Sequence, residues 1–298
     1  MEVVMERIIK GGIFSILSAA SFASLVVIVR LGYDTGLSTL NMLLLRFGFA
    51  VILMGGFFLI FKRETLKAKK STLIKAFFTG SILYTLQAFS FFKGVKYASP
   101  NVVEFILYLY PAMVSVISRF VFKESFNFYK IFYITVILIG FAFIFKEAFH
   151  SKASLLGILF SSLAMVVYSF YLICIELFVK DENAITFSFY TIFFAFLSFL
   201  IINLFLGLPQ FSSQKVFIGL LLGLIPTFFA IMFLFLAIDN IGSALTSVFS
   251  SVEPVITVFL SFFILHLSLT PNQFIGGFLI LVGVFLVNIY HLRGSRYA

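Results

Sequence analysis

The chain has 298 residues, of which 62% are hydrophobic and 11% are charged, with a mean hydropathy of +1.16 and a net charge of +9. Soluble globular proteins carry about 25% charged residues, so the composition excludes a water-soluble globule and predicts an all-α integral membrane protein. The positive charge does not indicate nucleic acid binding, because it is distributed over the short connections between apolar segments, where it sets membrane orientation.

Ten apolar segments are long enough to cross a bilayer as helices. A spanning helix needs roughly 20 residues, since its backbone amides and carbonyls must be bonded within the segment. The predicted spans are 11–30, 38–61, 72–94, 98–119, 127–145, 154–178, 185–206, 214–237, 242–265 and 272–291. They use most of the chain, so we expect a single transmembrane domain over 1–298.

From residue 76 onward, the sequence repeats itself 143 residues later without a gap. The matched residues are Gly80 and Gly223 (223 − 80 = 143), Pro111 and Pro254, and Gly140 and Gly283. Each unit contains five spans, an odd number, so the second unit must enter the membrane from the opposite face. The sequence therefore predicts two inverted five-helix repeats, at about 11–145 and 154–291.

Basic residues are more frequent on one side of the predicted spans than on the other. Their densest cluster lies between Lys62 and Lys75, and the segments before the first span and after the last one are also basic. Because Lys and Arg collect on the cytoplasmic side, we expect a multi-pass inner-membrane protein with both termini in the cytoplasm.

Three prolines fall inside predicted spans, where each removes a helical hydrogen bond and kinks the helix. Pro111 lies in the fourth span and Pro254 at the equivalent place in the ninth, so we expect matched kinks. Pro226 lies in the eighth span, where the third span has Leu83. The eighth helix is therefore expected to bend where the third does not.

Three ionisable residues, Arg46, Glu104 and Glu253, lie at membrane depth. Such groups are costly in a bilayer unless they face a cavity or a partner. At 1.5 Å per residue, their positions along the spans place them at similar depth. Two interpretations stay open: a structural ion pair of Arg46 with one glutamate, or a substrate or proton site in which the unpaired glutamate carries the proton.

Other polar residues at this depth follow symmetry-related faces of the fourth and ninth spans, since Glu104 and Tyr108 correspond to Ser247 and Ser251. Serines in membrane helices more often serve helix packing, which is the alternative interpretation. Tyr168 and Tyr171 of the sixth span are weaker candidates. The predicted cavity or gating residues are Arg46, Tyr84, Gln87, Glu104, Tyr108, Ser247, Ser251 and Glu253.

Motifs for ATP hydrolysis, zinc binding and nucleophilic catalysis do not occur in the sequence. We therefore expect no cofactor, no metal site and no enzymatic activity. The remaining alternatives to transport are a membrane enzyme acting on lipid-linked substrates and a non-transporting structural or signalling subunit.

Several short motifs in register resemble the EamA-type transporters of the drug/metabolite transporter superfamily. They are Leu45-Arg46-Phe47 in the second span, the matched prolines, Val252-Glu253-Pro254-Val255, Phe122-Lys123-Glu124 after the fourth span, and the glycine-bearing segments 137–141 and 280–284. One departure is Leu267, where the family commonly has an acidic residue equivalent to Glu124.

This resemblance implies a secondary transporter of small organic solutes that works by alternating access, with its cavity between spans three, four, eight and nine. Members of the family often export amino acids, other metabolites or drugs. The expected partners are a small-molecule substrate, the lipid bilayer and protons as a candidate coupling ion, in a monomer or homodimer.

Overall fold

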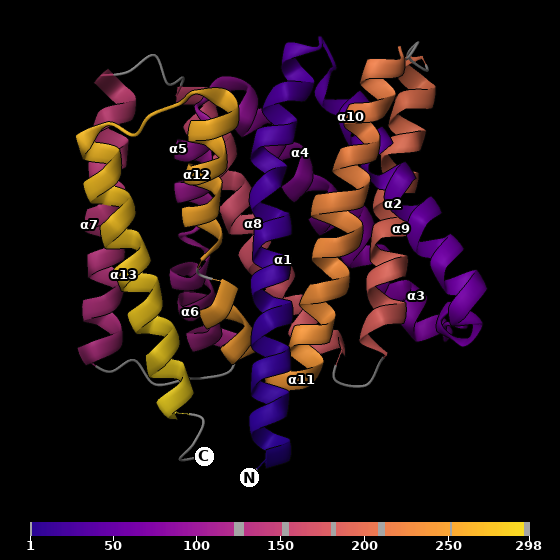
Figure 1. Ribbon diagram of the computed structural model, residues 1–298, viewed down its shortest axis with the longest axis horizontal. Coiled ribbons are helices and arrows are strands. Elements are labelled where there is room, and N and C mark those ends of the chain that lie inside the picture. Colours follow the sequence, from indigo (N-terminus) through magenta and orange to yellow (C-terminus); the bar gives the residue numbers. More distant parts are fainter. Residues whose placement is uncertain are drawn as a thin grey trace.

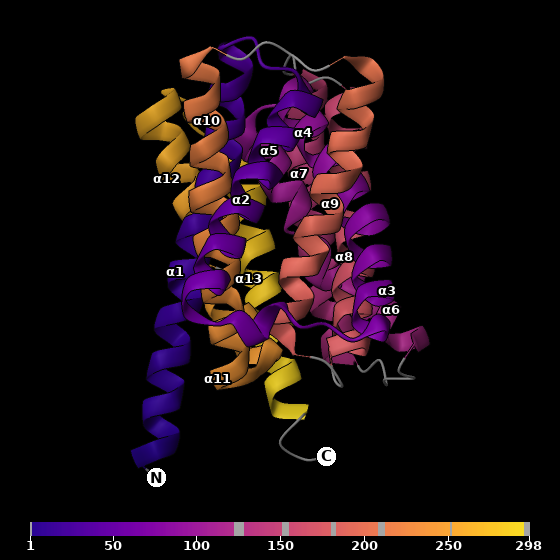
Figure 2. The same cartoon turned by 90° about the vertical axis from the view of Figure 1, so that its right-hand side faces the viewer.

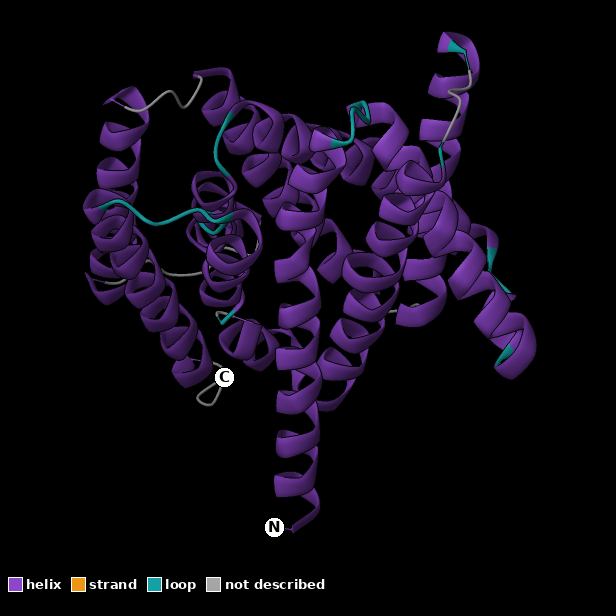
Figure 3. Ribbon diagram, turned by 45° about the horizontal axis from the view of Figure 1, so that its top comes forward, coloured by secondary structure: helices purple, strands orange, loops and turns teal. Residues whose placement is uncertain are grey.

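The computed structural model describes residues 2–121, 128–150, 155–179, 183–207, 212–250 and 252–294. These residues form helices and connecting loops, and none of them lies in a β-strand (Figure 3). The helices are α1 (Glu2–Asp34), α2 (Thr39–Phe61), α3 (Lys70–Phe77), α4 (Thr85–Tyr97), α5 (Pro100–Leu107), α6 (Tyr110–Val121), α7 (Phe128–His150), α8 (Leu155–Val179), α9 (Ala184–Leu206), α10 (Ser213–Gly223), α11 (Ala230–Ser250), α12 (Glu253–Leu265) and α13 (Pro271–Gly294). A 3-10 helix, η1 (Arg63–Leu66), and two π-helical segments, η2 (Phe78–Tyr84) and η3 (Leu224–Phe229), complete the fold.

The helices form one upright bundle, and α1 begins at the same face at which α13 ends (Figures 1 and 2). Within the described residues, five helical stretches are long and apolar enough to cross a membrane uninterrupted: Glu6–Asp34, Thr39–Phe61, Leu155–Ile175, Ile185–Leu206 and Ser213–Leu234. Predicted span three is divided into α3, η2 and α4, and predicted span four into α5 and α6. We call the face that carries the termini the terminal face and the other the distal face.

Helix starts follow from local capping chemistry. The hydroxyl of Ser38 accepts the Asn41 amide hydrogen at 3.2 Å, and the side chain of Asn183 accepts the amides of Ile185 and Thr186, both at 3.1 Å. Pro100 occupies the first position of α5, where a missing N–H costs nothing. Short polar turns between apolar runs thus set where the chain reverses.

The contact between α7 and α13 shows the inverted symmetry directly. A side chain at Gly140 would approach the carbonyl oxygen of Gly276 to 2.6 Å, and one at Gly283 would approach the carbonyl oxygen of Tyr133 to 3.1 Å. Gly283 and Gly276 lie 143 residues after Gly140 and Tyr133, so each contact is the symmetry mate of the other. The two helices lie side by side at one end of the bundle (Figure 1). The prediction of an all-α membrane protein with inverted repeats is confirmed.

Spans three and eight carry π-helical segments at equivalent places, so the contrast expected from Pro226 is not observed. The π segment of the third span forms without a proline, and its glycine, Gly80, packs against the backbone of Thr191. In each segment a threonine hydroxyl donates to the carbonyl oxygen five residues earlier, Thr85 to Gly80 at 2.9 Å and Thr227 to Leu222 at 2.8 Å. Carbonyls left free by the wider turn are satisfied in this way.

Spans four and nine are interrupted immediately before their matched prolines. The first interruption is the turn at Tyr108 and Leu109, ahead of Pro111 in α6. The second separates Ser250, the last residue of α11, from Glu253 and Pro254 at the start of α12. The side chain of Pro111 lies outside the described residues, whereas that of Pro254 is buried. Both interruptions fall near the middle of the bundle.

Helix α11 contains the chain reversal between spans eight and nine without leaving helical geometry. Ser18 of α1 donates to the carbonyl oxygen of Ala230, and Ser15 donates to that of Thr246, both at 2.8 Å. A straight helix would separate those two carbonyls by roughly 24 Å at 1.5 Å per residue, whereas Ser15 and Ser18 are one turn apart. The predicted boundary at 237–242 is therefore a bend within α11, near Asn240, and not a loop.

Candidate functional site

Arg46 of α2 lies at the centre of the bundle and is 2% exposed. Its Nε donates to Thr227 Oγ1 at 2.9 Å, and its Nη2 donates to the hydroxyl of Tyr84 at 3.4 Å. The rings of Phe47 and Phe92 flank the guanidinium at 5.1 and 5.6 Å from their centroids. A cation is thus held by hydroxyl oxygens and aromatic faces.

The two hydroxyl partners of Arg46 are symmetry mates. Tyr84 is the last residue of η2, and Thr227, 143 positions later, lies within η3. A group bound by equivalent positions of two inverted repeats must lie near the axis that relates them. Arg46 therefore occupies the boundary between the halves, where π-helical segments from both of them meet.

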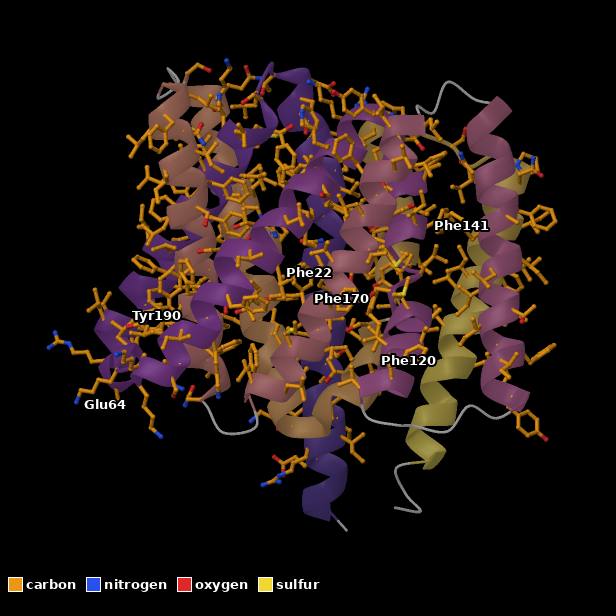
Figure 4. The ribbon with its side chains drawn as sticks, turned by 180° about the vertical axis from the view of Figure 1, so that it is seen from behind. Phe22, Glu64, Phe120, Phe141, Phe170 and Tyr190 are labelled. Carbon is orange, nitrogen blue, oxygen red and sulfur yellow. The ribbon has the colours of Figure 1, made fainter. Side chains whose placement is uncertain are left out.

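Arg46 does not form the ion pair that was one interpretation of the sequence. The ion pairs among the described residues are Arg30 with Asp34 at 3.7 Å and Lys67 with Glu64 at 2.8 Å. Glu64 lies at the edge of the bundle (Figure 4), far from its centre. Both glutamates at membrane depth are described, so the guanidinium charge faces no carboxylate in this conformation. Its third nitrogen, Nη1, makes no hydrogen bond to the described residues and is not enclosed by them.

The two glutamates lie close together on α5 and α12, near enough to interact electrostatically. Glu104 is 3% exposed, its carboxylate lies beside the Thr257 hydroxyl, and its Oε1 has no hydrogen-bond partner in the described structure. The hydroxyl of Tyr108 donates to Glu253 Oε2 at 2.8 Å and lies 3.0 Å from the carbonyl oxygen of Ser250. Tyr108, at the interruption of span four, thus contacts both ends of the interruption in span nine.

A row of tyrosines joins Arg46 to the glutamates. Tyr84 stacks on Tyr171 at 5.1 Å between centroids, Tyr171 on Tyr168 at 6.1 Å, and Tyr168 meets Tyr110 edge-on at 5.1 Å. Tyr110 meets Tyr108 at 5.7 Å. Tyr110, Tyr168 and Tyr171 are only half-buried although they lie at mid-span and contact rings on other helices. Their exposed surface therefore faces the space between helices.

The other predicted site residues have different outcomes. Gln87 is buried on α4, one turn from Tyr84, and its side chain is not among the hydrogen-bond partners of Arg46. The side chain of Ser247 on α11 and the whole of Ser251 lie outside the described residues. Their roles stay predictions.

Sequence reasoning missed two residues of this region. Thr257, beside Glu104, follows Glu253 by one helical turn, and this spacing is a signal that could have indicated it. Tyr110 was aligned with Glu253 in the repeat but was not predicted to join the site. Its contact with Tyr168 of α8 depends on helix packing, which no local pattern records.

Two cavities open toward opposite faces of the bundle. The distal cavity, of about 480 Å³, is lined by Arg30, Asp34, Lys96, Tyr97, Ala98, Ser99, Pro100, Leu265, Leu267 and Gln273. The terminal cavity, of about 230 Å³, is lined by Met54, Phe57, Phe58, Lys62, Ile185, Ser188, Ile231, Met232 and Leu236. Both repeats contribute to each cavity.

Comparisons with known proteins agree with this architecture. The model of the EamA-like transporter family matches residues 9–146 and again residues 155–289. Uncharacterized transporter YyaM of Bacillus subtilis (strain 168) is 28% identical over 253 residues, which cover 80% of this chain and 81% of that protein. Uncharacterized transporter YoaV of the same organism is 26% identical over 198 residues, covering 65% and 68%.

A crystal structure that shares 16% sequence identity superposes with a TM-score of 0.67, covering 95% of this chain and 98% of the other. That likeness supports the fold. The twofold match of one family model, its coverage of nearly the whole length and the symmetric contacts lead to one conclusion: the chain belongs to the EamA-like transporter family.

Proposed function

We propose that this protein is a secondary transporter that exports small organic solutes, such as amino acids, other metabolites or drugs, by alternating access. The observation that carries the proposal is the position of Arg46, which is bound by symmetry-equivalent residues of both halves. If the halves rock against each other, both bonds must change together, so the central charge responds to which side is open.

The free donor of Arg46 suits an acidic group on the solute. Its Nη1 is unpaired, and the guanidinium presents a planar set of donors that matches a carboxylate. The nearby tyrosine rings offer apolar faces with hydroxyl edges for the rest of the molecule. The site is thus suited to a small solute with an anionic end and an apolar body.

The carboxylate pair supports coupling to protons. Two ionised carboxylates that share a buried site repel each other, so one of them is stabilised by taking up a proton. Glu253, whose Oε2 already accepts from Tyr108, is the proposed proton carrier.

The charge distribution supports the proposed orientation. Both helix ends at the terminal face are basic, as is the segment that begins at Lys62. The positive-inside rule then places this face in the cytoplasm of an inner-membrane protein. In that orientation the distal cavity opens to the outside.

The test begins with untargeted metabolite comparison of cells with and without the gene. Solutes that accumulate in the deletion are then followed in reconstituted vesicles under an imposed proton gradient. Transport predicts flux of an unmodified solute, reduced by Arg46→Ala. A covalently altered product would indicate the membrane enzyme instead, and no flux over amino acids, metabolites and lipophilic cations would favour a structural subunit.

A further inference from the structure

Four buried side-chain atoms of the described residues have no hydrogen-bond partner: Ser90 Oγ, Asn101 Oδ1, Glu104 Oε1 and Ser261 Oγ. Leaving a polar atom buried and unpaired is costly, so such atoms point to something that binds them. Three of the four lie on α5 and α12, which contact each other. Asn101 is 2% exposed and Ser261 is 0% exposed.

Helical spacing brings these atoms to one region. Asn101 precedes Glu104 by three residues and Ser261 follows Thr257 by four, so each lies one turn nearer to the distal face on the same side of its helix. Glu104 and Thr257 lie beside each other across the two helices. Pro100 and Leu265, at the distal ends of α5 and α12, both line the distal cavity. Oxygen atoms therefore lead from that cavity to the carboxylates.

The charge of this region calls for a cation. Glu104 and Glu253 interact with each other, and in the described part of the chain neither forms an ion pair with a basic residue. A proton on Glu253 reduces their repulsion but leaves Asn101 Oδ1 and Ser261 Oγ unsatisfied. A metal ion held by several oxygens would satisfy the remaining charge and these atoms at once.

We propose that Asn101, Glu104, Thr257 and Ser261 form a binding site for a monovalent alkali cation that enters from the distal cavity. The set consists only of oxygen donors, which hard cations prefer. It contains a single carboxylate, which balances a single positive charge. Among the described residues no group of three or more His, Cys, Asp or Glu forms a site of the kind that divalent ions use.

The cation site rests on the proposed transport function only for its use as a coupling site, because binding can be measured without a solute. In that role Glu104 would carry the metal ion and Glu253 the proton. The same two helices that are interrupted at mid-span would then respond to both ions.

Thermal unfolding of the purified protein in detergent tests the site, with NaCl or KCl replacing choline chloride at constant ionic strength. Ligands that bind only the folded state raise Tm in a saturable way. We expect one of the two salts to raise Tm by about 2 to 4 °C. The comparison between Na⁺ and K⁺ identifies the preferred ion.

Three variants and a matched control locate the effect. Glu104→Gln, Asn101→Leu and Ser261→Ala should each require at least about tenfold more of the salt for the same shift in Tm. Ser90→Ala removes the fourth unpaired atom. Ser90 lies one turn before Gly94, which packs on Ser161 of α8, so it faces away from α12. This control should keep the wild-type salt response.

Equal Tm values in all three salts would overturn the proposal, as would a Glu104→Gln variant with the wild-type response. Equilibrium binding of radioactive ²²Na⁺ or ⁸⁶Rb⁺, the latter as a K⁺ analogue, to wild type, Ser261→Ala and Ser90→Ala gives a second readout if one variant folds poorly. Ion binding without solute flux would contradict the transport proposal alone. Flux without ion binding would contradict the cation site alone.

Discussion

At positions 84 and 227 the first repeat has a tyrosine and the second a threonine, yet both hydroxyls contact the guanidinium of Arg46. The backbone that presents them is the same π-helical segment in each half. The side chains differ in reach, and the two bonds differ in length, 2.9 Å to Thr227 and 3.4 Å to Tyr84. The halves are therefore equivalent in scaffold and unequal in how tightly they hold the central charge.

The same contrast holds at the helix interruptions. Tyr108 at the first interruption donates to Glu253 at the second, while Glu253 aligns with Tyr110 and has no acidic mate in the first repeat. Symmetric glycines at the contact of α7 and α13 preserve close packing in both repeats. The repeats teach that duplication supplies a frame able to rock, whereas the polar groups that bind and couple are unique to one side.

The largest expected effect comes from the central charge. Arg46→Ala should lower solute flux at least about 100-fold, because losing a buried, hydrogen-bonded charge typically costs 2–5 kcal/mol. Initial rates in vesicles measure this. Arg63→Ala, which alters an exposed arginine bonded to the carbonyl oxygen of Leu59, is the matched control and should stay within about twofold of wild type. A well-folded Arg46→Ala protein with normal flux would remove Arg46 from the mechanism.

The next prediction separates the two halves. Thr227→Val should slow transport about tenfold and Tyr84→Phe about threefold, since a hydrogen bond to a charged group contributes about 1.5–3 kcal/mol and the longer bond contributes less. Both substitutions nearly preserve side-chain volume. Equal effects would show that the halves hold Arg46 equally, and a larger effect of Tyr84→Phe would contradict the geometry.

A third prediction concerns coupling. Glu253→Gln keeps an oxygen that can accept from Tyr108 but cannot carry a proton, so solute exchange should continue while the response to an imposed pH gradient is lost. Flux with and without that gradient measures the difference. Tyr108→Phe serves as the comparison, with slower transport that still responds to the gradient. Full pH-dependent transport by Glu253→Gln would exclude it as the proton carrier.

The smallest effect is expected in the tyrosine row. Tyr168→Leu should reduce solute affinity by roughly threefold to tenfold, because it removes a ring that contacts Tyr110 and Tyr171. Tyr168→Phe keeps the ring and should remain within about twofold of wild type. The concentration dependence of flux distinguishes them. Similar loss in both variants would indicate that the hydroxyl matters and the ring contacts do not.

Much of the fold follows from periodicity alone. Apolar spans of sufficient length and a repeat of constant offset predict the bundle and its inverted halves, because backbone bonding in a bilayer leaves few alternatives. Arg46, Glu104 and Glu253 were predicted as a group since charge at membrane depth is rare. Composition and spacing are sufficient for these features.

Features that depend on packing could not be predicted. The π-helical segment of the third span contains no proline, and it forms where Gly80 meets the backbone of α9. The partner of Arg46, Thr227, is 181 residues away, and the repeat pairs Thr227 with Tyr84 without indicating that both reach Arg46. The expectation of an ion pair failed because charge alone does not determine which side chains meet.

Alternating access is the central claim, and the two cavities allow a direct test of it. In a Cys174→Ser background, spin labels at Lys96→Cys and Leu267→Cys report the distance across the distal cavity, and labels at Lys62→Cys and Leu236→Cys report that across the terminal cavity. Pulsed electron paramagnetic resonance in lipid should show two populations at each pair, with added solute shortening one distance as it lengthens the other. A single, unchanging distance at both pairs under every condition would contradict the account.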